Sequence, residues 1–361
     1  MMQAFDLIVV GGGPAGCSAA ITAARGGARV LLLEKAQLPR HKVCGEFISP
    51  EAVTLLADLF RSTESLFLLR NAHRISRARM FVDENLIEAP VEPAGASITR
   101  YDLDLGLFRA AASANVDARM GTTVDDVRRH NGDFDVVTSE GVCRARAVIN
   151  ASGRWSNLKR RPGLNGPRWI GIKAHYREAA PPDSVDLYFF DGGYCGVQAL
   201  GPDTINACAM VRADVGTTLD AVFAQHEHLA QRSRGWEPLI PQVSTAPLLF
   251  HRPLLSEDGV VNAGDAAGFV DPFVGDGISI ALHSGAMAAD SLRSYWRGEA
   301  PLAQALDRYG ELYRQNLRPV FRRAALLRWI LSLPRTVRAP MLNIMRSSRV
   351  ARMVVERTRA L

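Results

Sequence analysis

Three glycines near the start of the chain have the spacing of a phosphate-binding turn. Gly11, Gly13 and Gly16 form the pattern G-x-G-x-x-G, and Ala15 stands between the last two. The apolar run 4–10 precedes the pattern, and an Ala-rich helical stretch follows it. Such a turn lets the backbone approach a pyrophosphate closely, and the N-terminus of the helix attracts its negative charge.

An acidic residue follows at the position that this kind of turn requires. Glu34 ends the second predicted strand, 28–35, and lies 23 residues after Gly11. A carboxylate there can hold the ribose hydroxyls of a dinucleotide. A purely structural glycine turn leaves Glu34 unexplained, so we interpret the first 35 residues as a dinucleotide-binding unit.

Two further segments carry candidate chemistry. In RHKVCGEFISP, residues 40–50, Cys44 stands beside Gly45 and Glu46, and a cysteine next to a glycine could approach a planar ring closely. The alternative is a free buried cysteine that only fills space. Arg100 precedes a predicted helix at 101–114 and could reach a phosphate, although an exposed arginine is the usual case.

A long motif lies between residues 262 and 285. The predicted buried strand 259–263 is followed by Gly264 and Asp265, where a carboxylate can accept hydrogen bonds from sugar-like hydroxyls. A loop with Pro272 then leads to a helix that begins near Ile278. The N-terminus of that helix would stabilise negative charge on a ring or a ring carbonyl.

The pattern of elements predicts an α/β fold. Helices and buried strands flank a block of alternating segments, which are typical of an antiparallel sheet. We therefore expect a Rossmann-type binding domain with an inserted antiparallel-sheet substrate domain and a C-terminal helical region. The predicted boundaries are 1–70, 96–165 and 255–300 for the binding domain, 71–95 and 166–254 for the substrate domain, and 301–361 for the helical region.

Taken together, these motifs resemble a known family. GGGPAG with Glu34, Arg100, AVINASGRWS at 147–156 and GDAAGFVDPFVGDG at 264–277 look like the flavoproteins with the p-hydroxybenzoate-hydroxylase-type FAD fold. Within them, VCGE at 43–46 and PFVGDGISIAL at 272–282 resemble the geranylgeranyl reductase family. The resemblance implies FAD as the cofactor.

The resemblance also implies roles for individual residues. Cys44 matches a family cysteine near the flavin ring, which makes it the candidate catalytic residue. The implied FAD contacts are Gly11, Gly13, Ala15, Gly16, Glu34, Lys35, Gly45, Glu46, Ile48, Arg100, Val124, Gly264, Asp265, Gly277 and Ile278. The implied substrate pocket includes Tyr194, Gly196, Gln198 and Pro272, and we expect no metal site.

One stretch departs from the family pattern. Prenyl reductases carry a Tyr-x-Trp-x-Phe-Pro motif, whereas GGYCGVQAL at 192–200 keeps only the tyrosine. The pocket wall is therefore different, and a prenyl substrate is in doubt. The Trp-x-Trp-x-Ile-Pro motif and the catalytic lysine of the halogenase branch are missing, which argues against halogenation.

The resemblance favours hydride transfer from reduced flavin to a carbon–carbon double bond of a hydrophobic, isoprenoid-like small molecule. Two alternatives stay open: a monooxygenase acting on an aromatic, polyketide or lipid substrate, and a non-catalytic electron-transfer or redox-sensing flavoprotein. Because the chain has no second G-x-G-x-x-G pattern, we expect NAD(P)H or an electron-carrier protein to act as a transient reductant.

The charge distribution bears on partners and location. The formal net charge of the chain is +6, yet residues 318–361 contain eleven arginines and one acid, which leaves the rest at about −4. This distribution does not suggest a nucleic-acid binder. Five scattered cysteines and the lack of a signal peptide or an apolar span predict a cytoplasmic protein. The basic helical tail suggests peripheral contact with the inner face of a membrane, or simply packing on the body.

Overall fold

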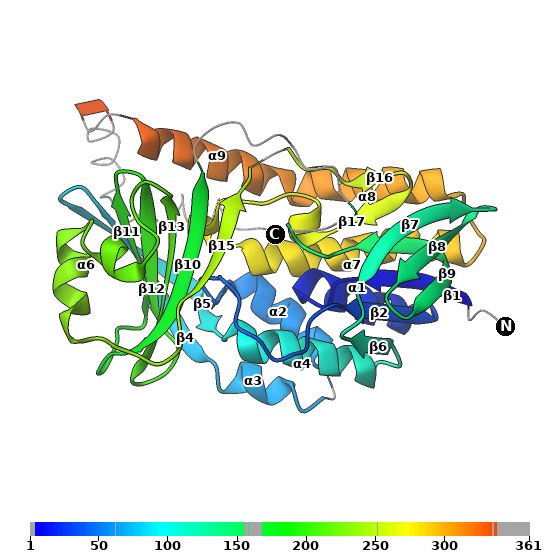
Figure 1. The fold of residues 1–361 in the computed structure, drawn as a ribbon, viewed down its shortest axis with the longest axis horizontal. Coiled ribbons are helices and arrows are strands. Elements are labelled where there is room, and N and C mark those ends of the chain that lie inside the picture. The colour runs from blue at the N-terminus through cyan, green and yellow to red at the C-terminus, as the bar shows by residue number, and fades with distance from the viewer. Residues whose placement is uncertain are drawn as a thin grey trace.

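The computed structural model describes residues 4–61, 63–154, 158, 168–250, 252–333 and 336–337. Two sheets lie at opposite ends of an elongated molecule, with helices packed between and beside them (Figure 1). The first sheet is mainly parallel in its centre, and the second is mainly antiparallel. This mixed α/β architecture with C-terminal helices confirms the predicted fold class.

The first sheet contains the predicted dinucleotide unit. Its central strands β1, β2 and β9 pair in parallel, and β1 and β2 are buried along almost their whole length, as is typical of strands in a parallel sheet. The main path of strands is β16 (Ser256–Glu257), β17 (Val260–Asn262), β9 (Gly141–Asn150), β1 (Ala4–Val10), β2 (Val30–Glu34) and β6 (Asp117–Met120). An antiparallel extension from β9 adds β8 (Asp133–Thr138) and β7 (Val124–His130).

Helices α1 (Pro14–Arg25) and α7 (Gly277–Trp296) pack against each other over this sheet. Their closest approach depends on Gly285, since a Cβ there would lie 2.0 Å from the carbonyl oxygen of Ala15. The Ser18 hydroxyl donates to the carbonyl of Leu282 at 2.7 Å and joins the same two helices. The remaining helices around the sheet are α2 (Pro50–Leu59), α3 (Leu66–Arg70) and α4 (Arg100–Ser113).

The second sheet is built almost wholly from the predicted substrate domain. Its path is β14 (Glu237–Pro238), β10 (Trp169–Arg177), β13 (Thr204–Arg212), β12 (Gly193–Ala199), β11 (Ser184–Phe190), β4 (His73–Val82), β5 (Asn85–Ser97) and β3 (Phe47–Ile48), and β15 (Val243–Leu248) also pairs with β10. Only β3 begins outside the segments 71–95 and 166–254. The domain boundaries themselves stay a prediction.

The two faces of the second sheet differ in chemistry. On β10, Ile172 and Ala174 join an apolar cluster with α5 (Leu219–Phe223) and α6 (Glu227–Arg232). The alternating residues Lys173 and His175 face the other way and contact Glu46. The polar face of the sheet therefore turns toward the loop that precedes β3.

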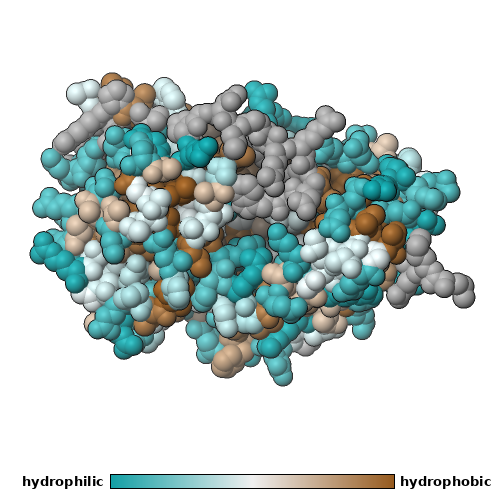
Figure 2. Space-filling model, in the orientation of Figure 1, coloured by the Kyte–Doolittle hydropathy of each residue, from teal (hydrophilic) through white to brown (hydrophobic). Residues whose placement is uncertain are grey.

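Two helices complete the described part of the C-terminal region, α8 (Leu302–Asn316) and α9 (Arg318–Ser332). Helix α9 packs on the body through the buried residues Val320 and Ala324, while Leu326 and Trp329 are more than half exposed. On the face drawn in Figure 2, hydrophobic residues appear in several separate groups between hydrophilic ones. Across the described segments, we find no helix long and apolar enough to cross a bilayer. Residues 338–361, which carry most of the predicted basic tail, lie outside the described residues.

Candidate functional site

A cavity lies between the two sheets, and we call it the inter-sheet cavity. It holds about 1100 Å³ of empty space, part of which is open to solvent. Residues from both sheets and from the N-termini of α1, α4 and α7 line it. The predicted site residues in its lining are Gly13, Ala15, Cys44, Gly45, Glu46, Arg100, Tyr194, Gly264, Asp265, Pro272, Gly277 and Ile278.

A narrower groove continues from this cavity along the first sheet, and we call it the Glu34 groove. The two spaces share Gly13, Lys42 and Ala151, so that they form one path. The remaining predicted residues in the groove lining are Gly11, Glu34, Lys35 and Val124. Gly16 and Ile48 are buried close to this path, and neither appears in the described lining of either space.

The glycine turn connects the groove to the cavity. Gly13 is the N-cap of α1 and has no side chain with which to occupy the N–H groups of the first turn. Gly16 permits the tight turn, because a Cβ there would lie 1.8 Å from the carbonyl oxygen of Gly11. The Glu34 carboxylate accepts hydrogen bonds from the Gly12 N–H at 2.8 Å and the Ala36 N–H at 2.9 Å. These bonds fix the carboxylate at the edge of the groove and leave each oxygen a further lone pair.

A second helix N-terminus opens into the inter-sheet cavity. Within the described part of the chain, the side chain of the α7 N-cap residue, Asp276, forms no capping hydrogen bond. Gly277 and Ile278 start the helix and line the cavity. The side chain of Asp265, on the preceding loop, lies 3.7 Å from the Arg154 guanidinium. This edge of the cavity thus offers helix N–H groups beside a carboxylate that can accept hydrogen bonds.

Arg100 lies at the start of α4 between the two spaces. Its guanidinium donates to both oxygens of Asp104, at 2.7 and 2.8 Å. The pKa of Arg100 is raised: burial works against the charged form, but the Asp104 carboxylate outweighs it. A Cβ on Gly13 would lie 4.0 Å from Nη2 of Arg100. The positive charge is therefore held in place beside the glycine turn.

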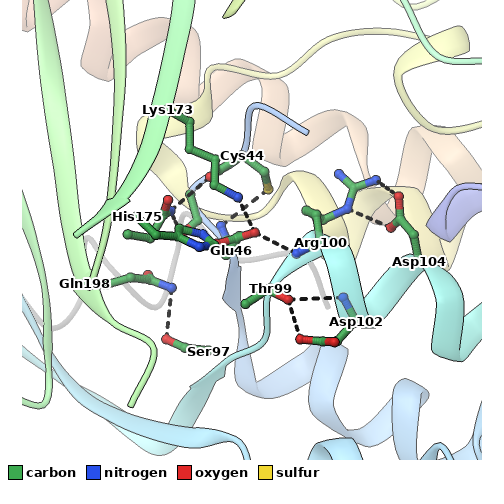
Figure 3. A network of polar contacts seen from close by, with 12 residues as sticks. Cys44, Glu46, Ser97, Thr99, Arg100, Asp102, Asp104, Lys173, His175 and Gln198 are labelled. Carbon is green, nitrogen blue, oxygen red and sulfur yellow. Dashed lines mark hydrogen bonds and ion pairs between the residues drawn. The ribbon is translucent and has the colours of Figure 1, made fainter. Parts of the chain in front are cut away.

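Glu46 is the centre of a buried polar network (Figure 3). Its backbone has a φ of 62°, which is uncommon for a residue with a side chain. One carboxylate oxygen accepts from Nζ of Lys173 and from the Arg100 N–H at 2.6 Å. The other lies 2.7 Å from Nε2 of His175. Burial alone would raise the pKa of Glu46, but the hydrogen bond with His175 and the charge of Lys173 outweigh it and lower that pKa.

The same network secures the backbone of the loop. Nδ2 of Asn206, on β13, donates to the carbonyls of Cys44 and Gly45 at 3.0 and 2.8 Å. The Glu46 N–H points to Sγ of Cys44 at 3.4 Å. The second sheet thereby holds Cys44 at the cavity wall. Sequence reasoning missed Lys173 and Asn206; the available signal was a lysine and an asparagine in otherwise apolar, alternating strands.

Comparison with known proteins decides the family. A family model described as FAD dependent oxidoreductase matches residues 6–154. The menaquinone reductase of Mycobacterium tuberculosis is 30% identical over 360 residues, which cover 89% of this chain and 83% of that protein. The digeranylgeranylglycerophospholipid reductase of Methanocella arvoryzae is 28% identical over 347 residues, 88% of this chain and 84% of that protein.

The chain belongs to the geranylgeranyl reductase family of FAD-dependent oxidoreductases. Its fold is shared more widely. A flavin-dependent brominase has a TM-score of 0.80 at 20% identity, with 98% of this chain and 94% of that one covered. At that level of identity the likeness concerns the fold alone.

The residues of this geranylgeranyl reductase family member fit FAD. The Glu34 groove and the inter-sheet cavity form one path with a carboxylate at one end, an uncapped helix N-terminus at the turn and another helix N-terminus near Ile278. Glu34 would hold the ribose, the α1 N-terminus the diphosphate, and Asp265 the ribityl chain. The roles of the individual residues stay predictions.

Lys42 is a further site residue that sequence reasoning missed. It lines both spaces at their junction, beside the glycine turn. Burial lowers the pKa of Lys42 to about 8, and the nearby Arg100 charge adds to this effect. An ammonium group at this position suits the diphosphate of FAD. The signal was its place two residues before Cys44, in the motif already singled out.

One part of the cavity wall is apolar in this family member. Tyr194, Met210 and Leu248 of the second sheet form a buried cluster with Phe269 of the loop after β17, and all four line the cavity. Gly196 and Gln198 are absent from the described lining of the cavity. Gln198 instead donates to the Ser97 hydroxyl at 2.9 Å and helps to join β12 to β5.

Proposed function

We propose that this protein reduces a carbon–carbon double bond in a hydrophobic, isoprenoid-like substrate. The observation that carries the proposal is the apolar cluster of Tyr194, Met210, Leu248 and Phe269, which lines the same inter-sheet cavity as the predicted FAD residues. Such a wall suits an alkyl or polyprenyl chain because contact with it removes apolar surface from water. The names of the two relatives, a menaquinone reductase and a digeranylgeranylglycerophospholipid reductase, support the same substrate class.

Bound FAD supplies the redox chemistry, a hydride for one carbon of the double bond. The chain must then hold the substrate, exclude water and provide a proton for the other carbon. Cys44 and Tyr194 both line the cavity and carry a transferable proton. Burial raises the pKa of Tyr194 well above its usual value, so its hydroxyl stays protonated at neutral pH. We propose Cys44 and Tyr194 as the candidate donors.

The electrons come from outside the chain in this proposal. The sequence holds one G-x-G-x-x-G pattern, which belongs to the FAD path. We propose that NAD(P)H or an electron-carrier protein acts as a transient reductant. The reaction then balances: two electrons and two protons enter, and one double bond becomes a single bond.

Product analysis tests this function. The FAD-loaded protein is supplied with NADPH, or with dithionite as an artificial donor, and with menaquinone as the first substrate and digeranylgeranylglycerophospholipid as the second. The proposal predicts a product that, after any hydroquinone has been reoxidised in air, is still heavier by two hydrogen atoms and contains no added oxygen. A product with added oxygen would contradict the proposal and favour a monooxygenase.

A further inference from the structure

A second cavity lies under the C-terminal helices, and we call it the arginine cavity. It is formed between α8, α9 and the two loop segments 252–255 and 269–271. It holds about 1820 Å³ of empty space, part of which is open to solvent. Phe269 and Val270 line both this cavity and the inter-sheet cavity, so the two are direct neighbours.

The arginine cavity is strongly positive. Of the described residues in its lining, five are arginines and one is an acid: Arg252, Arg314, Arg318, Arg322, Arg328 and Asp271. Arg328 pairs with Asp271, and Arg314 pairs with Glu311. Within the described ranges, Arg318 and Arg322 have no carboxylate partner. They stand one helical turn apart at the start of α9, so that both guanidinium groups can reach one ligand.

A buried hydroxyl in the same lining lacks a partner. Tyr313 is 2% exposed, and its hydroxyl forms no hydrogen bond with any described residue. A buried polar group without a partner loses its interaction with water and gains nothing in return. The Tyr309 hydroxyl, one turn earlier on α8, does bond to the carbonyl of Asn262 at 2.9 Å. The contrast shows that the Tyr313 hydroxyl has an unused hydrogen-bonding capacity beside the cavity.

Aromatic side chains form the floor of the arginine cavity and divide it from the inter-sheet cavity. The rings of Phe250 and Phe269 lie 5.2 Å apart. The Arg328 guanidinium covers Phe250 at 3.4 Å, and the Arg154 guanidinium covers Phe269 from the inter-sheet side at 4.3 Å. The cavity therefore combines a cationic rim with an apolar floor that also includes Phe321.

We propose that the arginine cavity binds the phosphate group of a lipid-like phosphate ester. Arg318 and Arg322 supply planar N–H donors that match phosphate oxygens, and the Tyr313 hydroxyl supplies one more. Phe250 and Phe321 contact the apolar part of the ester. An inorganic phosphate would use the rim alone and leave the floor exposed. This site requires no redox step, so it can be tested without the proposed reaction.

The test measures binding by calorimetry to the oxidised, FAD-loaded full chain. The probes are dihexanoylphosphatidic acid, dihexanoylphosphatidylcholine and sodium pyrophosphate, with both lipids kept below their micelle concentrations. We expect the phosphatidic acid to bind at least about tenfold more tightly than the other two. Equal affinities for the phosphatidic acid and pyrophosphate would overturn the lipid-like ester in favour of a soluble phosphate. Equal affinities for the two lipids would overturn the phosphate site.

Variants locate the binding in the cavity. The double variant Arg318→Gln with Arg322→Gln is expected to weaken the binding of phosphatidic acid at least about tenfold. The matched control, Arg109→Gln with Arg308→Gln, removes the same charge at two exposed positions elsewhere and should leave affinity within about twofold. Tyr313→Phe should weaken binding severalfold without lowering the thermal midpoint, because it removes a hydroxyl that has no partner in the free protein. Equal losses in the cavity pair and the control pair would overturn the proposal.

Discussion

Glu46 and Lys173 form an ion pair in which both side chains are completely buried. The pair joins the Cys44 loop, which lines the inter-sheet cavity, to strand β10 of the second sheet. His175 and the Arg100 N–H occupy the remaining positions around the carboxylate. One carboxylate thus connects the Cys44 loop, strand β10 and the start of α4 at the cavity.

We expect Glu46→Gln to be more destabilising than Lys173→Met. The first change leaves a buried ammonium group without its counter-charge, at a cost of about 3–5 kcal/mol. The second leaves Glu46 its hydrogen bonds with His175 and the Arg100 N–H, so that part of the network survives. Urea unfolding of the three proteins measures the difference. Asp126→Asn, in the exposed pair with Arg128, should change stability by about 0.5 kcal/mol or less and is the control. Equal losses for Glu46→Gln and Lys173→Met would contradict this account of the pair.

The lowered pKa of Glu46 gives a pH dependence of stability. The contribution of Glu46 is present above its unfolded pKa of about 4.3, and it is lost as the pH falls through the lower, folded pKa. We therefore expect the wild type to lose more stability than Glu46→Gln as the pH falls from about 5 to about 3. Thermal midpoints across this range measure the effect, and parallel curves would show that Glu46 does not titrate in this way.

FAD affinity should fall above about pH 8, because Lys42 has a pKa of about 8 and loses its charge there. The charged form attracts the diphosphate, so the dissociation constant should rise by up to about tenfold per pH unit. Fluorescence titration of the apoprotein with FAD at several pH values measures this slope. Lys42→Gln should bind FAD more weakly at neutral pH and show a flatter curve. If the variant keeps the slope of the wild type, another group is responsible.

The variants Cys44→Ala and Tyr194→Phe should lower the rate of substrate reduction by different amounts. If Cys44 provides the proton, Cys44→Ala lowers the rate of substrate reduction by about 10²-fold or more and leaves FAD affinity unchanged, whereas Tyr194→Phe has a small effect. The reverse order would assign the proton to Tyr194. Cys143→Ala, at a half-buried cysteine on β9 outside the described cavity lining, is the control. Two variants with the full wild-type rate would exclude both residues as donors.

A larger side chain in the apolar cluster should weaken substrate binding more than FAD binding. Met210 lies in the buried cluster with Tyr194 and Phe269 and lines the inter-sheet cavity. Met210→Trp adds bulk to that space, so KM for a long hydrophobic substrate should rise about tenfold while the FAD dissociation constant stays within about twofold. Leu86→Trp, at an exposed position, controls for the added indole. A weaker FAD complex with unchanged KM would place the substrate elsewhere.

The elements that line the inter-sheet cavity and the Glu34 groove were predictable because their signals are local. The spacing from Gly11 to Glu34 and the loop from Gly264 to Ile278 each lie within one stretch of sequence, and the structure brings them to one path. Lys173 and His175 were not predictable in their role. Their contacts with Glu46 span more than a hundred residues, and they depend on which face of β10 turns toward the loop.

Contacts made by the C-terminal region were also not predictable from the sequence. The sequence predicts basic helices there, but it does not show that Arg328 reaches Asp271 and covers Phe250. That contact depends on how α9 lies against the loop after β17. Gly196 and Gln198 show how a motif can suggest a role that the fold does not support. The resemblance implied that both line the substrate pocket, whereas neither appears in the described cavity lining and Gln198 donates to the Ser97 hydroxyl.

The most direct test of the proposed function is a single anaerobic turnover. The FAD-loaded protein is reduced with one equivalent of dithionite, freed of excess reductant and mixed with menaquinone. The account predicts that the visible absorbance of oxidised flavin returns and that an equal amount of substrate gains two hydrogen atoms, which stay in its prenyl chain after the quinone ring is reoxidised in air. Flavin that stays reduced until oxygen is admitted, with the substrate then recovered unchanged or oxygenated, would contradict it.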